Sequence, residues 1–131
     1  MNAETPVKEI MTKEVIVVAI DDPVAKVEDI FESNPIHHVV VLEEGQLRGI
    51  ISKSDLLRIY RDVAKNGPPK MDSMTAKEIM IANPMVVDPD DTIGLVSDII
   101  LANKFHSLPV VEDGELLGIV TNHDLIKYSY Q

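Results

Sequence analysis

Two short motifs place a hydroxyl and a carboxylate at one fixed spacing, and this pair could hold a phosphorylated sugar. The motifs are Gly49-Ile50-Ile51-Ser52-Lys53-Ser54-Asp55 and Gly118-Ile119-Val120-Thr121-Asn122-His123-Asp124. Each is predicted to lie where a strand enters a helix. A helix N-terminus offers unpaired N–H groups to a phosphate, a hydroxyl can donate to the same oxygens, and a carboxylate can accept from two ribose hydroxyls. The motifs therefore suit a nucleotide.

The same spacing has a second interpretation, because Ser or Thr followed three residues later by an acidic residue is close to a capping box. In a capping box the two side chains satisfy backbone N–H groups at the helix start and bind no ligand. The two interpretations are compatible with one another, so both stay open at this point.

An internal repeat positions both motifs. Lys8-Glu9-Ile10-Met11 recurs 69 residues later (77 − 8) as Lys77-Glu78-Ile79-Met80, and the same offset aligns the two motifs. One offset that holds without a gap indicates a duplicated unit. The stretch from Asn66 to Ser73 contains Gly67, Pro68 and Pro69, which is typical of a connector. We predict a first repeat at 1–65, a linker at 66–75 and a second repeat at 76–131.

Each repeat is predicted to have the element order β-α-β-β-α. Apolar and β-branched runs at 15–19 and 85–87 predict a short buried opening strand. In the first repeat, Asp22-Pro23 predicts an N-cap followed by the first helical residue. Gly45 and Gly114 predict a hairpin between the next two strands, and a second helix closes each repeat. A unit of about 55 residues buries little surface alone, so the two copies are expected to pack together.

The repeat resembles the CBS (cystathionine β-synthase) domain. The resemblance is carried by the element order, the Lys-Glu-Ile-Met opening, the stretches from Phe105 to Val111 and from Gly114 to Leu125, and their first-copy counterparts. It covers about 7–60 and 76–129, and the pair resembles a Bateman module. The resemblance implies an α/β fold in which two β-α-β-β-α CBS repeats pack with pseudo-two-fold symmetry. It also implies that adenosyl ligands bind in clefts between the repeats and that two modules often assemble into a flat disc.

The resemblance implies roles for the polar residues of both motifs. In the family the Ser or Thr contacts phosphate or ribose and the Asp holds the ribose diol. Residues just before the middle strand often reach phosphates there, which would suit protonated imidazoles; the alternative is a half-exposed imidazole bonded to a carbonyl. A metal site is disfavoured, because adjacent residues of an extended segment point to opposite sides and no further ligand stands beside them. The binding candidates are Ser52, Asp55, Thr121, Asp124, His37, His38 and His106.

The opening strands are expected to supply a slot for adenine, because a flat apolar ring needs aliphatic walls and a backbone edge. The candidates are Ile16 and Val17 in the first copy, and Met85 and Val86 in the second. The alternative is that these residues are plain core, at least where a side chain faces inward.

The two sites are predicted to differ in charge. Val40 stands in the first copy where Pro109 stands in the second. The first copy also has more cations near its motif, which favours a more highly charged ligand such as a triphosphate. The alternative for its helical cations is an ordinary solvated face. The first copy has Lys53, Arg58, Arg61 and Lys65, and the second has Lys127 and His123.

These features predict a sensor module that binds an adenine nucleotide (AMP, ADP or ATP) or S-adenosylmethionine and acts on a partner protein, with Mg²⁺ entering only through ATP. We expect a homodimer of CBS pairs. The alternative is a ligand-free dimerisation and interaction module. An enzyme is disfavoured, because the sequence pairs no nucleophile with a base, and because the two repeats leave little chain for a catalytic domain. Output would therefore pass to another chain.

Composition excludes several other classes of protein. The 131 residues have a formal net charge of −10 and only 4% aromatic residues, which argues against nucleic-acid binding. The absence of Cys excludes disulfides, Cys-ligated metals and thiol nucleophiles. No signal peptide or apolar run long enough for a membrane span is visible, so we expect a cytoplasmic protein.

Overall fold

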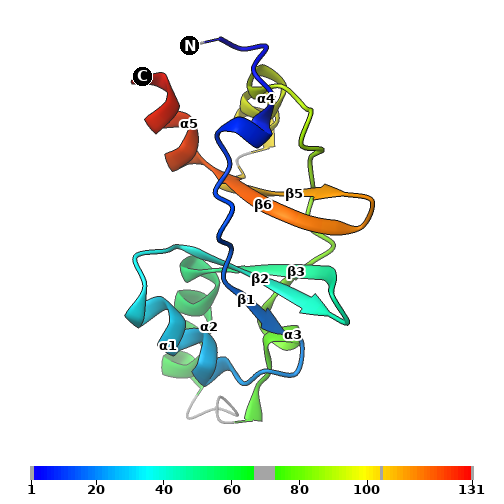
Figure 1. Ribbon diagram of the computed structural model, residues 1–131. Coiled ribbons are helices and arrows are strands. Elements are labelled where there is room, and N and C mark those ends of the chain that lie inside the picture. The colour runs from blue at the N-terminus through cyan, green and yellow to red at the C-terminus, as the bar shows by residue number, and fades with distance from the viewer. Residues whose placement is uncertain (1, 67–72, 104, 131) are drawn as a thin grey trace. The chain divides into compact units, whose positions relative to one another are not determined.

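The protein divides into two compact units that do not coincide with the sequence repeats. The computed structural model describes residues 2–66, 73–103 and 105–130; of the predicted linker, residues 67–72 lie outside this described part. We call residues 16–84 the first-repeat unit, and residues 1–15 together with 85–131 the second-repeat unit. Each unit combines strands with helices (Figure 1), which confirms the predicted α/β class.

The first-repeat unit is built on a four-stranded sheet in the order β1-β2-β3-β4. β1 is parallel to β2, and the β2–β3 and β3–β4 pairs are antiparallel. Glu44 and Gly45 both have positive φ angles, 49° and 80°, and close the predicted hairpin between β2 and β3. The elements of this unit are β1 (Val17–Ala19), α1 (Val24–Ser33), β2 (His38–Glu43), β3 (Gln46–Ser52), α2 (Lys53–Asn66), α3 (Ala76–Ile79) and β4 (Ile81–Ala82).

The helices of this unit cover the sheet through apolar residues at helical spacing. Val27 and Phe31 of α1 are buried together with Val39 and Ile51 of the sheet. The predicted start of α1 is wrong by one residue, because Pro23 is the N-cap with ψ of 150° and no side chain caps the helix. The carboxylate of the preceding Asp22 closes the turn before the helix instead, accepting from the backbone N–H of Ala19 at 2.8 Å.

The second-repeat unit repeats this pattern around a two-stranded sheet of β5 and β6. Asp113 and Gly114 close its hairpin with φ angles of 51° and 81°, as Glu44 and Gly45 do in the other unit. Its elements are the 3₁₀ helix η1 (Val7–Glu9), α4 (Ile93–Asn103), β5 (Ser107–Glu112), β6 (Glu115–Thr121) and α5 (Asn122–Ser129).

The opening strand predicted at 85–87 is reduced to a single bridge between Val87 and Val110, and Met85 and Val86 are exposed. A proline explains this difference. In the first repeat, the N–H of Val40 donates to the carbonyl of Ile16 at 3.2 Å and extends the pairing beyond β1. Pro109 occupies the equivalent position in the second repeat and has no N–H, so this hydrogen bond cannot form there.

The opening segment of each repeat packs on the body of the other repeat. The N–H of Val7 donates to the carbonyl of Asp91 at 2.7 Å, and the equivalent bond joins Ala76 to Asp22 at 2.8 Å. A second such pair of bonds joins Ile93 to Thr5 and Val24 to Met74. Four backbone hydrogen bonds therefore repeat the same exchange in both units, and they explain why the compact units cross the sequence repeats.

This exchange requires the glycine of each motif. A Cβ atom on Gly49 would lie 2.4 Å from Sδ of Met80 and 2.9 Å from the carbonyl oxygen of Ile81. A Cβ atom on Gly118 would lie 2.7 Å from the carbonyl oxygen of Thr12 and 2.9 Å from Sδ of Met11. The methionines are the last residues of the repeated Lys-Glu-Ile-Met stretches. Within each unit, the Lys-Glu-Ile-Met stretch of one repeat therefore contacts the glycine of the other repeat's motif.

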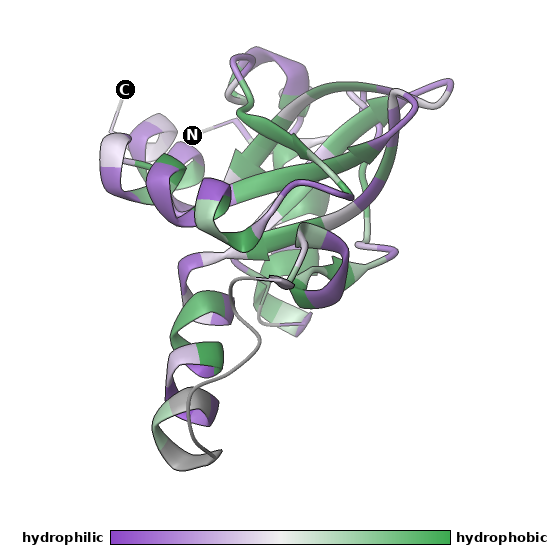
Figure 2. Cartoon of the chain, turned by 90° about the horizontal axis from the view of Figure 1, so that it is seen from below, coloured by the Kyte–Doolittle hydropathy of each residue, from purple (hydrophilic) through white to green (hydrophobic). Residues whose placement is uncertain are grey.

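Hydropathy follows the elements (Figure 2), with mainly hydrophobic strands and mixed helices. Within the described residues, no helix combines the length and the apolar composition that a membrane crossing requires.

Candidate functional site

In the first-repeat unit, Ser52 and Asp55 lie where β3 enters α2. Oδ2 of Asp55 accepts from the backbone N–H of Ser52 at 2.7 Å and from its hydroxyl at 3.0 Å. The hydroxyl of Ser52 in turn accepts from the backbone N–H of Asp55 at 3.2 Å. Oδ1 of Asp55 accepts from Nη2 of Arg58, one turn further along α2. Asp55 is only 5% exposed.

Thr121 and Asp124 form the equivalent arrangement where β6 enters α5. Oδ2 of Asp124 accepts from the N–H of Thr121 at 2.9 Å and from its hydroxyl at 3.2 Å. The hydroxyl of Thr121 accepts from the N–H of Asp124 at 3.3 Å, so the pair is a capping box. Oδ1 of Asp124 accepts from the hydroxyl of Thr12 at 3.0 Å. Asp124 is half-buried.

The capping interpretation of the sequence is therefore confirmed for the contacts inside each motif. It leaves room for the ligand interpretation, because the capping contacts use Oδ2 of each aspartate and leave Oδ1 to other donors. Those donors differ in kind: Arg58 gives Asp55 a cationic partner, and Thr12 gives Asp124 a neutral one. Sequence reasoning missed both partners. The sequence was compatible with Arg58 on an ordinary solvated helix face, and Thr12 belongs to a different sequence repeat from Asp124.

The strand register gathers the first-copy candidates at one end of the sheet. His38 opens β2 opposite Ser52, and the backbone carbonyl of His37 accepts from the N–H of Lys53 at 3.0 Å. Ile16 lies at the same end, since its carbonyl accepts from Val40 of β2. The imidazole of His37 is exposed, and the side chains of His38 and Lys53 are half-buried.

The second-copy candidates gather in the same way. Ser107 of β5 lies opposite Thr121, and the carbonyl of the preceding His106 accepts from the N–H of Asn122 at 3.2 Å. The side-chain amide nitrogen of Asn122 also lies 3.1 Å from Nδ1 of His106. This imidazole is therefore tied to the first residue of α5, beside the motif.

The predicted adenine slots consist of apolar side chains that remain accessible. Val17 is 40% exposed, Met85 45% and Val86 41%, whereas Ile16 is half-buried. The buried residue of each opening strand is the next one inward, Val18 or Val87. Ile16 packs against the buried core of the first-repeat unit, so the plain-core interpretation applies to it in part, whereas the other three candidates are exposed. The role of all four in adenine binding stays a prediction.

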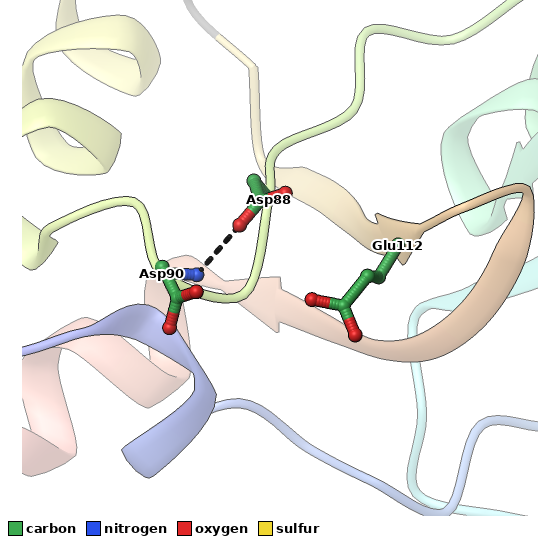
Figure 3. Close-up of side chains that lie close together, drawn as sticks. All are labelled: Asp88, Asp90 and Glu112. Carbon is green, nitrogen blue, oxygen red and sulfur yellow. Dashed lines mark hydrogen bonds between the residues drawn. The ribbon is translucent and has the colours of Figure 1, made fainter.

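The second-repeat unit also contains an acidic cluster that was not predicted from the sequence (Figure 3). Asp88, Asp90 and Glu112 bring carboxylate oxygens within 4.8 Å of one another, and all three side chains are exposed. Nζ of Lys8 lies 3.0 Å from Oδ1 of Asp90, and this hydrogen bond and the charge of Asp90 raise the pKa of Lys8. The predicted histidines are not part of this cluster, whose signal in the sequence is the Asp88-Pro89-Asp90-Asp91 run.

Comparison with known proteins identifies the repeat. The CBS domain family matches the chain twice, at residues 7–62 and 76–131. The uncharacterized protein MJ0188 from Methanocaldococcus jannaschii is 34% identical over 123 residues, which are 92% of this chain and 43% of that relative. The chain thus spans less than half the length of this curated relative.

Solved structures show the same fold. The structure of CBSX2 in complex with AMP has a TM-score of 0.83 and 24% identity and covers 96% of both chains. The CBS domain pair of protein MJ0100, in complex with 5-methylthioadenosine and S-adenosyl-L-methionine, has a TM-score of 0.80 and 27% identity and also covers 96% of both chains.

Proposed function

The chain belongs to the CBS domain family, and from this premise we propose that it is a regulatory module that binds an adenosyl ligand and acts on a partner protein. The ligand class is an adenine nucleotide or an S-adenosylmethionine-type compound. The observation that carries the proposal is the convergence in each unit of a helix N-terminus, a hydroxyl, a carboxylate and an imidazole at one end of the strands. These groups match the parts of a nucleotide.

The chemistry assigns a part of the ligand to each group. The first N–H groups of α2 and α5 would face phosphate or another anionic group, helped by Ser52 or Thr121. Oδ1 of Asp55 or Asp124 would accept from the ribose hydroxyls, since Oδ2 is held inside the cap. His37, His38, His106 and Lys53 would supply further donors. The apolar residues Ile16, Val17, Met85 and Val86 would cover the adenine ring.

The solved relatives support this ligand class. CBSX2 was determined with AMP, and the pair from MJ0100 was determined with 5-methylthioadenosine and S-adenosyl-L-methionine. All of these compounds share an adenosyl group. The aspartate of each motif would recognise its ribose, and the apolar slot would recognise its adenine. Mg²⁺ would enter only as a companion of ATP.

A second candidate function is a ligand-free interaction module. The capping boxes favour it, because both motifs satisfy their own helix starts without a ligand. Exposed apolar side chains on the helices of the second-repeat unit suit association of two chains, and they include Leu95, Leu101 and Ile126. Under both candidates we propose a homodimer, which sedimentation equilibrium would test, and a cytoplasmic location.

A thermal-shift panel separates the two candidates. The chain would be heated with AMP, ADP, ATP and S-adenosylmethionine, each with and without Mg²⁺. A ligand at about one hundred times its dissociation constant adds roughly 2.7 kcal/mol to the free energy of unfolding. We expect at least one compound to raise the melting temperature, and we expect Asp55→Ala with Asp124→Ala to remove that shift.

The chain provides a matched control for loss of a cap. Thr75 and Glu78 form a capping box at α3, with the N–H of Thr75 donating to Glu78 at 3.1 Å. Glu78→Ala removes a cap, which costs about 0.5–2 kcal/mol, but leaves both motifs intact. It should lower the melting temperature and preserve the ligand shift. No shift with any compound would favour the ligand-free module. A shift that survives both aspartate substitutions would place binding outside the two motifs and overturn the proposed site.

A further inference from the structure

Asp55 and Asp124 occupy equivalent positions, but Oδ1 of each carboxylate has a different partner. Asp55 is buried, and the guanidinium of Arg58 binds its Oδ1, the oxygen outside the capping contacts. Asp124 is half-buried, and its Oδ1 accepts from the hydroxyl of Thr12 at 3.0 Å. The residue equivalent to Arg58 is Lys127, and none of the ion pairs among the described residues joins Lys127 to Asp124.

We propose that Arg58 determines the ligand specificity of the first-repeat site by exchanging Asp55 for the phosphate of the ligand. The inference rests on the proposed function and adds a selection rule to it. The first-repeat site selects phosphorylated adenosyl ligands over uncharged nucleosides. In the described part of the chain, no ion pair gives the carboxylate of the second-repeat site a cation, so that site discriminates less between the two ligand types.

The position of Arg58 suits such an exchange. Its guanidinium contacts Asp55 in the first turn of α2, which is the end of the helix where a phosphate binds. The Arg58 side chain is 61% exposed, so it can change rotamer without disturbing the core. A guanidinium binds phosphate and carboxylate oxygens with the same planar set of N–H donors.

The energetics differ between the two ligand types. A ribose diol needs the oxygen that Arg58 now occupies. When the ligand has a phosphate, Arg58 leaves one anion for another, and Asp55 receives the ribose hydroxyls in return. When the ligand is an uncharged nucleoside, Asp55 makes the same exchange, but Arg58 finds no second anion and moves into water. The lost ion pair is then not replaced, which weakens binding. The ion pair therefore acts as a latch that a phosphate opens.

Calorimetric titration of the full chain with adenosine and with AMP tests the latch. Asp124→Asn removes the carboxylate that would bind the ribose in the second-repeat site, so the binding that remains reports on the first-repeat site. In this background Arg58→Met keeps the side-chain length and removes the charge. We expect it to lower the preference for AMP over adenosine by about tenfold or more, since charge-assisted hydrogen bonds are lost to AMP while adenosine no longer competes with a cation.

The equivalent position gives the control. Lys127→Met, measured in an Asp55→Asn background, should change the corresponding preference by less than about threefold. Arg58→Lys keeps the charge but not the planar donor set, so it should give an intermediate preference for AMP over adenosine. It replaces Arg58→Met in the test if that variant folds poorly. A circular dichroism melt of each variant shows whether the comparison is between folded proteins.

The outcomes distinguish this inference from the function on which it rests. If Arg58→Met leaves the ratio of the two affinities unchanged, or weakens both ligands equally, the latch is refuted and ligand binding stands. If neither adenosine nor AMP binds the unsubstituted chain, the latch is refuted. If no compound of the thermal-shift panel binds either, the proposed function is refuted with it.

Discussion

Adding one methyl group to the glycine of each motif should destabilise the protein through the segment exchanged between the repeats. In Gly118→Ala the new Cβ would lie 2.7 Å from the carbonyl oxygen of Thr12. That oxygen accepts from the N–H of Ile119 at 2.9 Å, and the N–H of Thr12 donates back at 2.8 Å, so the backbone is held on both sides. Overpacking of this kind costs about 1–3 kcal/mol.

Gly49→Ala should also lower the free energy of unfolding, but the clash of its new Cβ can be relieved in a different way. Its two nearest atoms belong to the side chain of Met80, at 2.4 and 2.8 Å, and the backbone oxygen of Ile81 follows at 2.9 Å. A methionine side chain can move where a hydrogen-bonded carbonyl cannot. Met80→Ala should therefore rescue more of the Gly49→Ala loss than Met11→Ala rescues of the Gly118→Ala loss, as measured by two double-mutant cycles.

Urea denaturation followed by circular dichroism measures these free energies of unfolding. Gly94→Ala is the control, because the three atoms nearest to the new Cβ all belong to Ala3, at 3.1 Å or more, and alanine is the better helix former by about 1 kcal/mol. We expect it to be close to neutral. If Gly49→Ala and Gly118→Ala both cost less than about 0.5 kcal/mol, the close approach of the exchanged segments is contradicted.

Two further predictions concern pH. The hydrogen bonds that Asp22 accepts from Ala19 and Lys26 lower its pKa below 3.8, so Asp22→Asn should lower the free energy of unfolding by about 1 kcal/mol at neutral pH. The loss of stability should vanish as the pH falls through the lowered pKa. Urea denaturation from pH 7 to pH 2 measures it, and a loss that persists at pH 2 would contradict the prediction. Burial and Glu28 raise the pKa of Tyr60 from 10.0 to about 12, so the stability that Tyr60 adds should be full below pH 10 and lost between pH 10 and 12. An ultraviolet titration should show one phenol ionising late and should lose that step in Tyr60→Phe, and persistence of the step would assign it elsewhere.

Much of the fold follows from local sequence patterns. The glycine hairpins and the Ser or Thr to Asp spacing are local, and the structure confirms the turns at Gly45 and Gly114 and the capping contacts. These features could be predicted because each depends on residues only a few positions apart.

Features that depend on distant residues were less accessible. The exchange of opening segments depends on hydrogen bonds between residues far apart in sequence, such as Val7 with Asp91, and no local pattern encodes them. The shortened opening strand of the second repeat does have a signal in Pro109. The hydrogen bond that Pro109 cannot donate would have gone to Met85, more than twenty positions earlier in the chain. A row of cations on a helix also could not show that Arg58 pairs with Asp55.

The binding role of the motifs is the central claim, and calorimetric titration of the unsubstituted chain with AMP tests it most directly. We predict saturable binding that Asp55→Ala together with Asp124→Ala abolishes and that Glu78→Ala preserves. Saturable binding that survives in the double aspartate variant, or the absence of any binding to the unsubstituted chain, would contradict the claim.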